Sequence, residues 1–146
     1  MKKLLAGLLL FLSFPVNAES EVECLAKNIY FEARNQPWVG RLAIANVTIN
    51  RKESKRFPST VCKVVKQRSK NNICQFSWYC DGKSDVPYDL ATYNKARDIA
   101  MFVLPGKFPD VTEGALWYHA SYIKPPVWSK DYIKTVVIND HIFYKE

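Results

Sequence analysis

The sequence predicts a single, mainly helical domain of the α+β class with a small β-hairpin element. Apolar residues recur with helical spacing through the first two thirds of the chain, whereas β-branched and aromatic residues gather near its end. No internal repeat, low-complexity tract or Ser/Gly linker interrupts the chain after its N-terminal segment. Because 48% of the 146 residues are apolar and 14% are aromatic, a mainly disordered chain is excluded.

The N-terminal segment has the pattern of a secretory signal peptide. A short positive region, Lys2-Lys3, is followed by an apolar run, and Val16-Asn17-Ala18 supplies the small residues of a cleavage site. The run is too short to span a bilayer comfortably, which favours cleavage over a permanent anchor. We therefore expect a signal peptide over residues 1–18 and a mature domain over residues 19–146, exported to the periplasm or cell envelope without stable membrane insertion. An uncleaved signal that holds the domain at the inner membrane is the alternative.

Two consecutive helices are predicted next. From Ser20 to Arg34 the apolar residues follow the i, i+3, i+4, i+7 spacing of an amphipathic helix. Asn35-Gln36-Pro37 ends this helix, because the residue before a proline avoids the helical region. Pro37 suits the first position of a second helix, which runs to about Lys52. This second helix is apolar around most of its circumference, which predicts a central, buried position.

The rest of the chain is predicted to contain short helices, one long loop and two strands. In chain order, we expect a turn and helix cap over residues 57–60, a helix over 61–67, a loop over 68–87, a helix over about 88–104, and strands over 115–119 and 135–144. Asn139-Asp140 is predicted to form a hairpin turn inside the last segment.

The charge of the chain bears on its partners. Lys2 and Lys3 lie in the signal peptide, so 19 of the 21 basic residues remain against 14 acidic ones, a net charge of +5. The basic residues are scattered rather than arranged in a stripe, so we expect contact with anionic envelope polymers and not with nucleic acid. Simple solvation of the surface explains the same charge equally well. We expect a monomer without a cofactor.

Four cysteines occur, Cys24, Cys62, Cys74 and Cys80, and an even number in an exported chain favours two disulfide bonds. Cys74 and Cys80 are close in sequence, which favours joining them and leaves Cys24 for Cys62. Three connectivities are possible, and the sequence alone does not decide among them. Because no C-x-x-C pair occurs and the chain has only two histidines, a structural zinc site or a zinc amidase is disfavoured.

Glu32 is the most informative polar residue. Projected at 100° per residue, it lies at the edge of the apolar stripe of the first helix, next to Leu25. It also lies in the last turn of that helix, where the helix dipole and the apolar surroundings both disfavour a carboxylate. Both effects should raise the pKa of Glu32, as a general acid requires. On periodicity alone, a solvated glutamate explains the same position.

Several segments of the mature chain together carry a signature. They are Glu23–Arg34, Gly40–Val47 with Asn50-Arg51, Phe57–Cys62, Cys74–Trp78 with Cys80–Gly82, Gly114–Ala120 and His141–Tyr144. In this order they closely resemble the cell wall hydrolase family related to bacterial spore cortex-lytic enzymes. Each segment alone is a weak motif, whereas the set covers nearly all of the mature chain and is specific.

The resemblance implies a lysozyme-like catalytic domain that cuts the glycan strands of peptidoglycan, with Glu32 as the catalytic acid. The family's activity includes lytic transglycosylase chemistry at the bond between N-acetylmuramic acid and N-acetylglucosamine. In that mechanism Glu32 protonates the glycosidic oxygen, and its carboxylate then accepts the C6 hydroxyl proton as a 1,6-anhydro ring closes. The resemblance does not specify endo or exo cleavage, nor a role in remodelling, germination, secretion-system assembly or phage lysis.

Lysozyme-type hydrolysis, by a muramidase or glucosaminidase, is the closest alternative. It needs a second carboxylate at a defined separation from the acid. The formal candidates are Glu113, Asp110, Asp81 and Asp131, of which Glu113 immediately precedes a segment of the signature. A non-enzymatic alternative is a disulfide-bonded envelope protein that binds glycan or inhibits a lysozyme.

The residues expected to bind N-acetyl sugars carry an amide, a hydroxyl or a ring: Gln75, Phe76, Ser77, Trp78, Tyr118, His119 and His141. Tyr118 and His119 alternate on a strand, so one should point into the cleft and the other away. His141 is equally well explained as a hydrogen-bonded structural residue, and it is also a candidate for orienting Tyr118. Tyr30 and Arg34 are interpreted as packing and salt-bridge residues.

Overall fold

The computed structural model describes residues 18–146, so the predicted signal peptide lies outside the described residues except for Ala18. The helices are α1 (Glu21–Ala33), α2 (Trp38–Glu53), α3 (Val61–Val65) and α4 (Leu90–Val103), with short 3-10 helices η1 (Ser77–Cys80) and η2 (Val127–Lys130). The strands are β1 (Trp117–Ala120), β2 (Ile133–Ile138) and β3 (His141–Lys145), which form one antiparallel sheet. The predicted helix-dominated α+β class is confirmed. Across residues 18–146, no helix combines the length and apolar character needed to cross a bilayer.

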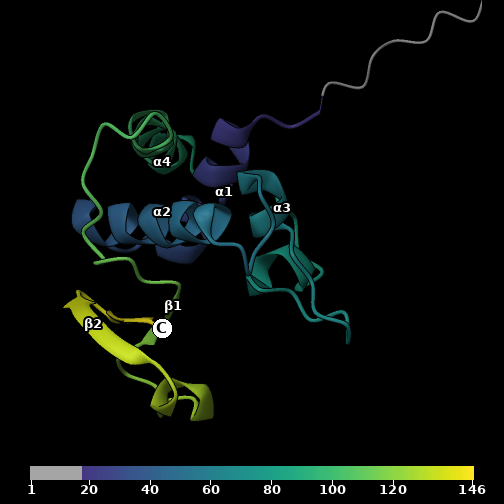
Figure 1. The fold of residues 1–146 in the computed structure, drawn as a ribbon. Coiled ribbons are helices and arrows are strands. Elements are labelled where there is room, and N and C mark those ends of the chain that lie inside the picture. Colours follow the sequence, from purple (N-terminus) through teal and green to yellow (C-terminus); the bar gives the residue numbers. More distant parts are fainter. Residues whose placement is uncertain (1–17) are drawn as a thin grey trace, which may run out of the picture.

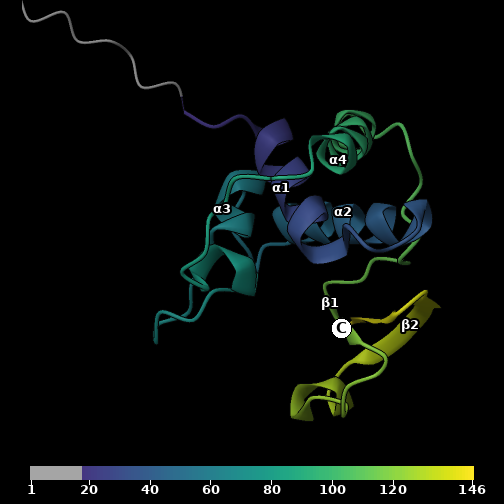
Figure 2. The same ribbon diagram turned by 180° about the vertical axis from the view of Figure 1, so that it is seen from behind.

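The helices and the sheet occupy opposite sides of the domain. In Figure 1, α4 lies at the top, α1 and α2 run below it, and the sheet lies beneath α2. Figure 2 shows the same arrangement from behind, with α3 and η1 to one side of α1, α2 and α4. Helix α1 contacts α2, α3 and α4, whereas α2 contacts the other helices and also β2.

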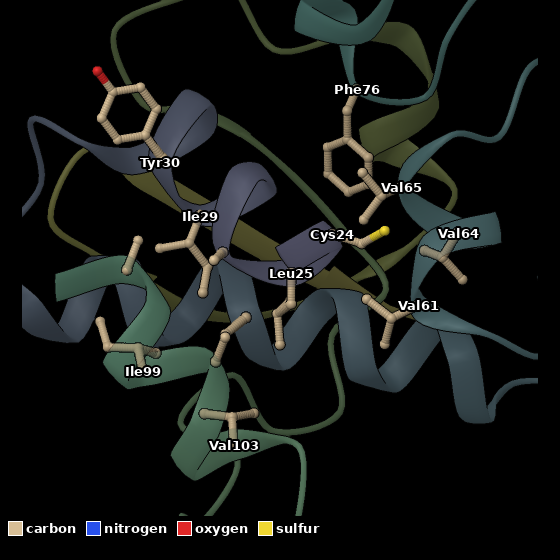
Figure 3. Close-up of a cluster of buried hydrophobic side chains, with 14 of the residues drawn as sticks. Cys24, Leu25, Ile29, Tyr30, Val61, Val64, Val65, Phe76, Ile99 and Val103 are labelled. Atoms are coloured by element: carbon tan, nitrogen blue, oxygen red, sulfur yellow. The ribbon is translucent and has the colours of Figure 1, made fainter. Parts of the chain in front are cut away.

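The main hydrophobic core surrounds α1. Leu25, Ile29 and Tyr30 are fully buried on the face that the periodicity predicted. They pack among residues of α3, α4 and the loop before η1, as Figure 3 shows for Val61, Val64, Val65, Phe76, Ile99 and Val103. Burying each large aliphatic side chain of this kind stabilises the fold by about 1.5–3 kcal/mol.

A second core lies between α2 and the sheet. Ala43, Ile44 and Val47 of α2 are fully buried and pack with Phe143 of β3 and Ile138 of β2. Helix α2 therefore has a core on two sides, and its predicted central position is confirmed.

Local capping explains where the helices begin. Ser20 and Glu23 form a capping box at the start of α1, in which the Glu23 carboxylate accepts the Ser20 backbone N–H at 2.9 Å. Pro37 is the residue before α2 rather than its first helical position, a difference of one residue. Helix α4 begins at Leu90, two residues later than predicted, because the Asp89 side chain caps it by accepting the Thr92 N–H.

The sheet has the strand order β1-β3-β2. The predicted hairpin is confirmed: β2 and β3 pair across Asn139-Asp140, and Asn139 has a left-handed φ of 49°. The β2 strand begins two residues earlier than predicted and contains a register shift between Lys134 and Val137. The pairing of β1 with β3 aligns Tyr118 with Phe143.

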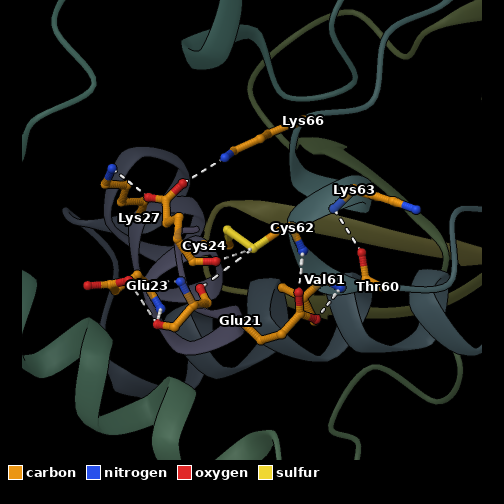
Figure 4. The surroundings of a disulfide bond; sticks show 11 residues. Glu21, Glu23, Cys24, Lys27, Thr60, Val61, Cys62, Lys63 and Lys66 are labelled. Carbon is orange, nitrogen blue, oxygen red and sulfur yellow. Dashed lines mark hydrogen bonds and ion pairs between the residues drawn. A yellow bond between two sulfur atoms is a disulfide. The ribbon is translucent and has the colours of Figure 1, made fainter. Parts of the chain in front are cut away.

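Two disulfide bonds join Cys24 to Cys62 and Cys74 to Cys80, the pairing that sequence proximity favoured. The first links α1 to α3, where the Glu21 carboxylate also accepts the backbone N–H groups of Val61 and Cys62 (Figure 4). The second closes a short loop that includes η1. This loop therefore holds η1 in place at the edge of the helical core.

Candidate active site

A cleft of about 690 Å³ opens between the C-terminal turn of α1 and the segment over residues 77–88. It is lined by Phe31, Glu32, Arg34, Ser77, Trp78, Asp81, Lys83, Ser84, Val86, Pro87 and Tyr88. The predicted acid and two of the predicted sugar contacts, Ser77 and Trp78, thus share one hollow with charged and aromatic neighbours. A cleft of this size lies within the range typical of small-molecule binding sites.

Glu32 lies in the wall of this cleft and is only partly exposed. Burial raises the pKa of the Glu32 carboxyl, while a hydrogen bond from Tyr118 and the nearby charge of Arg51 act in the opposite direction. The Tyr118 hydroxyl donates to Glu32 Oε2 at 2.6 Å. The environment therefore keeps the proton on Glu32 to a higher pH than usual, and it also holds two groups that stabilise the anion.

Tyr118 connects the acid to the sheet. It lies on β1, and its ring packs edge-on against His141 with the centroids 5.3 Å apart. Burial raises the pKa of the Tyr118 hydroxyl well above its ordinary value, so Tyr118 keeps its proton and remains a donor to Glu32. His141 thus lies behind Tyr118, in the position suggested for a residue that orients it.

Arg51 is a residue of the site that the sequence reasoning did not single out. It is buried near the end of α2, and its Nε donates to the Leu116 carbonyl at 2.7 Å. Its guanidinium contacts the rings of Phe57 and Phe76, 5.2 and 5.1 Å from their centroids. One nitrogen, Nη1, is buried without a hydrogen-bond partner in the described part of the chain. Two signals were available beforehand: Arg51 is a charged residue on a helix predicted to be buried, and it belongs to a signature segment.

A chain of buried hydrogen bonds fixes Trp78 in the cleft wall. The Trp78 indole Nε1 donates to Asn28 Oδ1 at 2.9 Å, and Asn28 Nδ2 donates to Thr48 Oγ1 at 3.1 Å. The Trp78 ring also stacks on Phe31 with the centroids 4.7 Å apart. The chain joins η1 to α1 and α2, so the position of the indole depends on both helices.

Other predicted sugar contacts lie outside the cleft. Phe76 is 2% exposed, packs in the main core against Arg51 and is not among the residues that line the cleft. His119 is buried on the other face of β1, where its ring nitrogens pair with the Tyr144 hydroxyl and the Ala120 carbonyl. Gln75 is exposed but is not among the residues that line the cleft.

The four candidate second carboxylates occupy different places. Asp81, which lies inside a signature segment, lines the cleft, whereas Glu113, which immediately precedes one, is exposed in a turn with a left-handed φ of 58°. Asp110 accepts hydrogen bonds from Asn50, Thr112 and Gly114 and so stabilises its own loop. Asp131 is exposed at the end of η2. Across residues 18–146, no group of three or more His, Cys, Asp and Glu side chains is arranged to hold a metal ion.

Comparison with known sequences gives consistent matches. The sequence profile of a family described as Cell Wall Hydrolase matches residues 35–144. A spore cortex-lytic enzyme from Halalkalibacterium halodurans is 30% identical over 128 residues, which cover 86% of this chain and 35% of that protein. The spore cortex-lytic enzyme of Bacillus subtilis is also 30% identical, over 86% of this chain and 38% of that protein. This chain therefore spans less than half the length of these curated relatives.

Solved structures of similar fold come from the same group. The catalytic domain of the Bacillus cereus SleB protein superposes with a TM-score of 0.70 and 27% identity, covering 88% of this chain and 94% of that one. The catalytic domain of the germination-specific lytic transglycosylase SleB from Bacillus anthracis gives a TM-score of 0.70 and 26% identity, covering 90% of this chain and 98% of that one. The fold described above is thus shared with these domains over nearly their entire length.

Proposed function

Because the chain belongs to the cell wall hydrolase family, we propose that it cleaves the glycan strands of peptidoglycan between N-acetylmuramic acid and N-acetylglucosamine, with Glu32 as acid and then base. The observation that carries the proposal is a single desolvated carboxyl in the cleft, held by the Tyr118 hydroxyl at 2.6 Å. The reaction proposed is that of a lytic transglycosylase, which leaves 1,6-anhydro-muramyl ends.

In the first step, the protonated Glu32 donates its proton to the glycosidic oxygen. The bond between that oxygen and C1 of the muramyl sugar breaks, so the departing sugar leaves with a free hydroxyl. Burial raises the pKa of Glu32 and so keeps this proton available at a higher pH. Tyr118 and the charge of Arg51 then stabilise the carboxylate that forms, which keeps the transfer from being too unfavourable.

In the second step, the Glu32 carboxylate accepts the proton of the muramyl C6 hydroxyl. The C6 oxygen bonds to C1 and closes the 1,6-anhydro ring, and Glu32 is protonated again. One residue thus performs both proton transfers. Because no water is consumed, no second carboxylate is required to activate it. A partly apolar cleft wall, formed in part by Phe31 and Trp78, is suited to limiting competition from water.

Hydrolysis is the second candidate, and one observation favours keeping it. Asp81 lines the same cleft as Glu32, whereas Glu113, Asp110 and Asp131 do not. If water replaced the C6 hydroxyl as the nucleophile, Asp81 would be the residue to activate it. Asp81, and not Glu113, is therefore the proposed second carboxylate.

Ser77 and Trp78 are the proposed contacts for the N-acetyl sugars, because a hydroxyl and an indole ring line the cleft beside Glu32. Gln75 is exposed next to this segment and remains a proposal for a sugar unit beyond the cleft. His141 is proposed to orient Tyr118 from behind rather than to touch the substrate.

The test is digestion of purified peptidoglycan sacs by the mature protein beside Glu32→Gln and Asp81→Asn, with products read by mass spectrometry. We expect anhydro-muramyl ends from the wild type and from Asp81→Asn, and intact sacs with Glu32→Gln. Reducing ends that disappear in Asp81→Asn would establish the hydrolase instead. Sacs that bind the protein but stay intact would favour a non-catalytic glycan-binding protein.

Family membership is consistent with an extracellular or cell envelope location. We propose, more narrowly, export to the periplasm as a monomer after removal of residues 1–18. Mass spectrometry of the protein isolated from cells tests the removal of residues 1–18, since a mature chain that begins at Glu19 is expected, and size-exclusion chromatography tests the monomeric state. A retained N-terminal segment would support the membrane-held alternative.

A further inference from the structure

Arg34 follows the proposed acid by two residues and forms part of the cleft wall. Its guanidinium lies over two aromatic rings, 5.5 Å from the centroid of Tyr30 and 5.2 Å from that of Tyr88. Tyr30 is fully buried and anchored by a hydrogen bond from the Asp89 backbone N–H, so this part of the support is rigid. Stacking on aromatic faces leaves the edges of a guanidinium free to donate hydrogen bonds.

No residue in the described part of the chain neutralises Arg34. The ion pairs over residues 18–146 join Glu19 to Lys27 and Lys66, and Arg56 to Glu146. The interpretation of Arg34 as a salt-bridge residue is therefore wrong for this structure: its charge is held by rings and is not paired with a carboxylate.

The charges of the cleft make an anionic ligand favourable. Arg34 and Lys83 line it together with Glu32 and Asp81. When Glu32 carries its proton, as the proposed first step requires, two cations face one carboxylate. Asp81 already accepts the Lys83 backbone N–H at 2.9 Å, which places it in the loop beside Lys83. The active protonation state of the cleft is thus net positive.

We infer that Arg34, with Lys83, forms a subsite for a carboxylate carried by the muramyl unit of the substrate. This inference rests on the proposed function and extends it to substrate selection. Muramic acid bears a lactyl group that ends in a free carboxylate, or in an amide to a stem peptide that has carboxylates of its own. Arg34 suits either source, because its planar fork pairs with a carboxylate through two parallel hydrogen bonds.

The test compares wild type, Arg34→Gln, Arg34→Lys and a control, Arg56→Gln, on three substrates. Arg56 is an exposed arginine outside the cleft, so its loss changes the net charge equally. The substrates are intact sacs, glycan strands stripped of stem peptides by an amidase, and stripped strands whose carboxylates have been converted to amides. The readout is the apparent KM and kcat, with melting curves to confirm that each variant is folded.

On carboxylate-bearing substrate we expect Arg34→Gln to raise the apparent KM about tenfold, equivalent to about 1.4 kcal/mol, with kcat largely kept. Arg34→Lys should recover part of this loss, and Arg56→Gln should change nothing. On the amidated strands, Arg34→Gln and the wild type should behave alike. An effect that survives on stripped strands assigns the lactyl carboxylate, and one seen only on intact sacs assigns the stem peptide.

Two results would overturn the subsite: an unchanged KM in Arg34→Gln, or an equal loss on charged and amidated strands. Binding of Glu32→Gln and of Glu32→Gln/Arg34→Gln to the same substrates is measured by co-sedimentation. This readout needs no turnover, so failure of the proposed reaction is distinguished from failure of the subsite. Weaker binding of the double variant to carboxylate-bearing strands alone supports the inference, and equal binding contradicts it.

Discussion

The hydrogen bond between Trp78 and Asn28 joins the cleft wall to the helical core, and its loss should be measurable as a coupling energy. Asn28 is fully buried and Trp78 is 8% exposed, so neither group finds water as a substitute partner. In Asn28→Leu, the Trp78 indole N–H loses its acceptor and Thr48 loses its bond from Asn28. An unsatisfied buried donor costs about 1–3 kcal/mol and a lost neutral hydrogen bond about 1 kcal/mol, so we expect about 2–4 kcal/mol of destabilisation.

A double-mutant cycle separates this bond from the general cost of changing two buried side chains. Trp78→Phe removes the N–H and leaves the Asn28 oxygen without its donor, which again costs about 1–3 kcal/mol in addition to lost packing. In the double variant both polar partners are gone. The double variant should therefore be less destabilised than the sum of the single ones by about 1–3 kcal/mol.

The assay is equilibrium urea unfolding of the four proteins with the disulfide bonds intact. Free energies that add to within about 0.5 kcal/mol would refute the coupling. The functional consequence is tested in parallel. Because Trp78 lines the cleft, Asn28→Leu should raise the apparent KM for peptidoglycan at temperatures where the variant is still folded.

Changes at the two groups that stabilise the Glu32 carboxylate, and at the second disulfide bond, have measurable consequences. Tyr118→Phe removes a hydrogen bond that lowers the pKa of Glu32. Because the acid then keeps its proton to a higher pH, the alkaline limb of the pH profile of kcat/KM should move to higher pH, while kcat falls roughly 10- to 100-fold. An alkaline limb that stays in place would contradict this. Arg51→Met removes a nearby positive charge and should move the same limb in the same direction, whereas Arg51→Lys should leave it nearly unchanged. Loss of activity at every pH, without a shift of the alkaline limb, would indicate that Arg51 has only a structural role. Replacing Cys74 and Cys80 by serine opens a loop of sequence separation 6, which should lower the free energy of unfolding by about 2 kcal/mol and raise the apparent KM. Thermal melts and activity assays check both effects, and an unchanged melt would argue against a stabilising bond.

Elements with local signals were predictable from the sequence. The start of α1 is specified by the reciprocal capping of Ser20 and Glu23, and its buried face by the spacing of apolar residues. The hairpin turn also has a local signal, because asparagine is one of the few residues besides glycine that adopt a left-handed φ at low cost, as Asn139 does. These features depend on neighbours within a few positions in the chain.

The positions and contacts of individual side chains were less predictable, because they depend on tertiary packing. Alternation along β1 predicts that Tyr118 and His119 point in opposite directions, but only the tertiary contact with α1 determines that Tyr118 points to Glu32 and His119 to Tyr144. Phe76 follows a polar residue in a loop, yet it is buried against the guanidinium of Arg51. No periodicity is available in such a loop to indicate an inward direction.

The position of Arg51 was beyond sequence reasoning for the same reason. Its hydrogen bond to the Leu116 carbonyl spans 65 residues, and its aromatic neighbours come from two other segments. A buried charge is costly unless it is stabilised in this way, so its presence beside Glu32 and Tyr118 makes it a strong candidate for function. The resemblance named this segment but assigned it no role.

The central claim is that Glu32 activates the muramyl C6 hydroxyl and not water. Digestion of peptidoglycan sacs in water enriched with ¹⁸O tests this most directly, with mass spectrometry of the newly formed muramyl ends. We expect ends that are one water lighter than a reducing sugar and carry no ¹⁸O, and no product at all with Glu32→Gln. Reducing ends that carry one ¹⁸O at C1 would contradict the account and would identify the protein as a hydrolase.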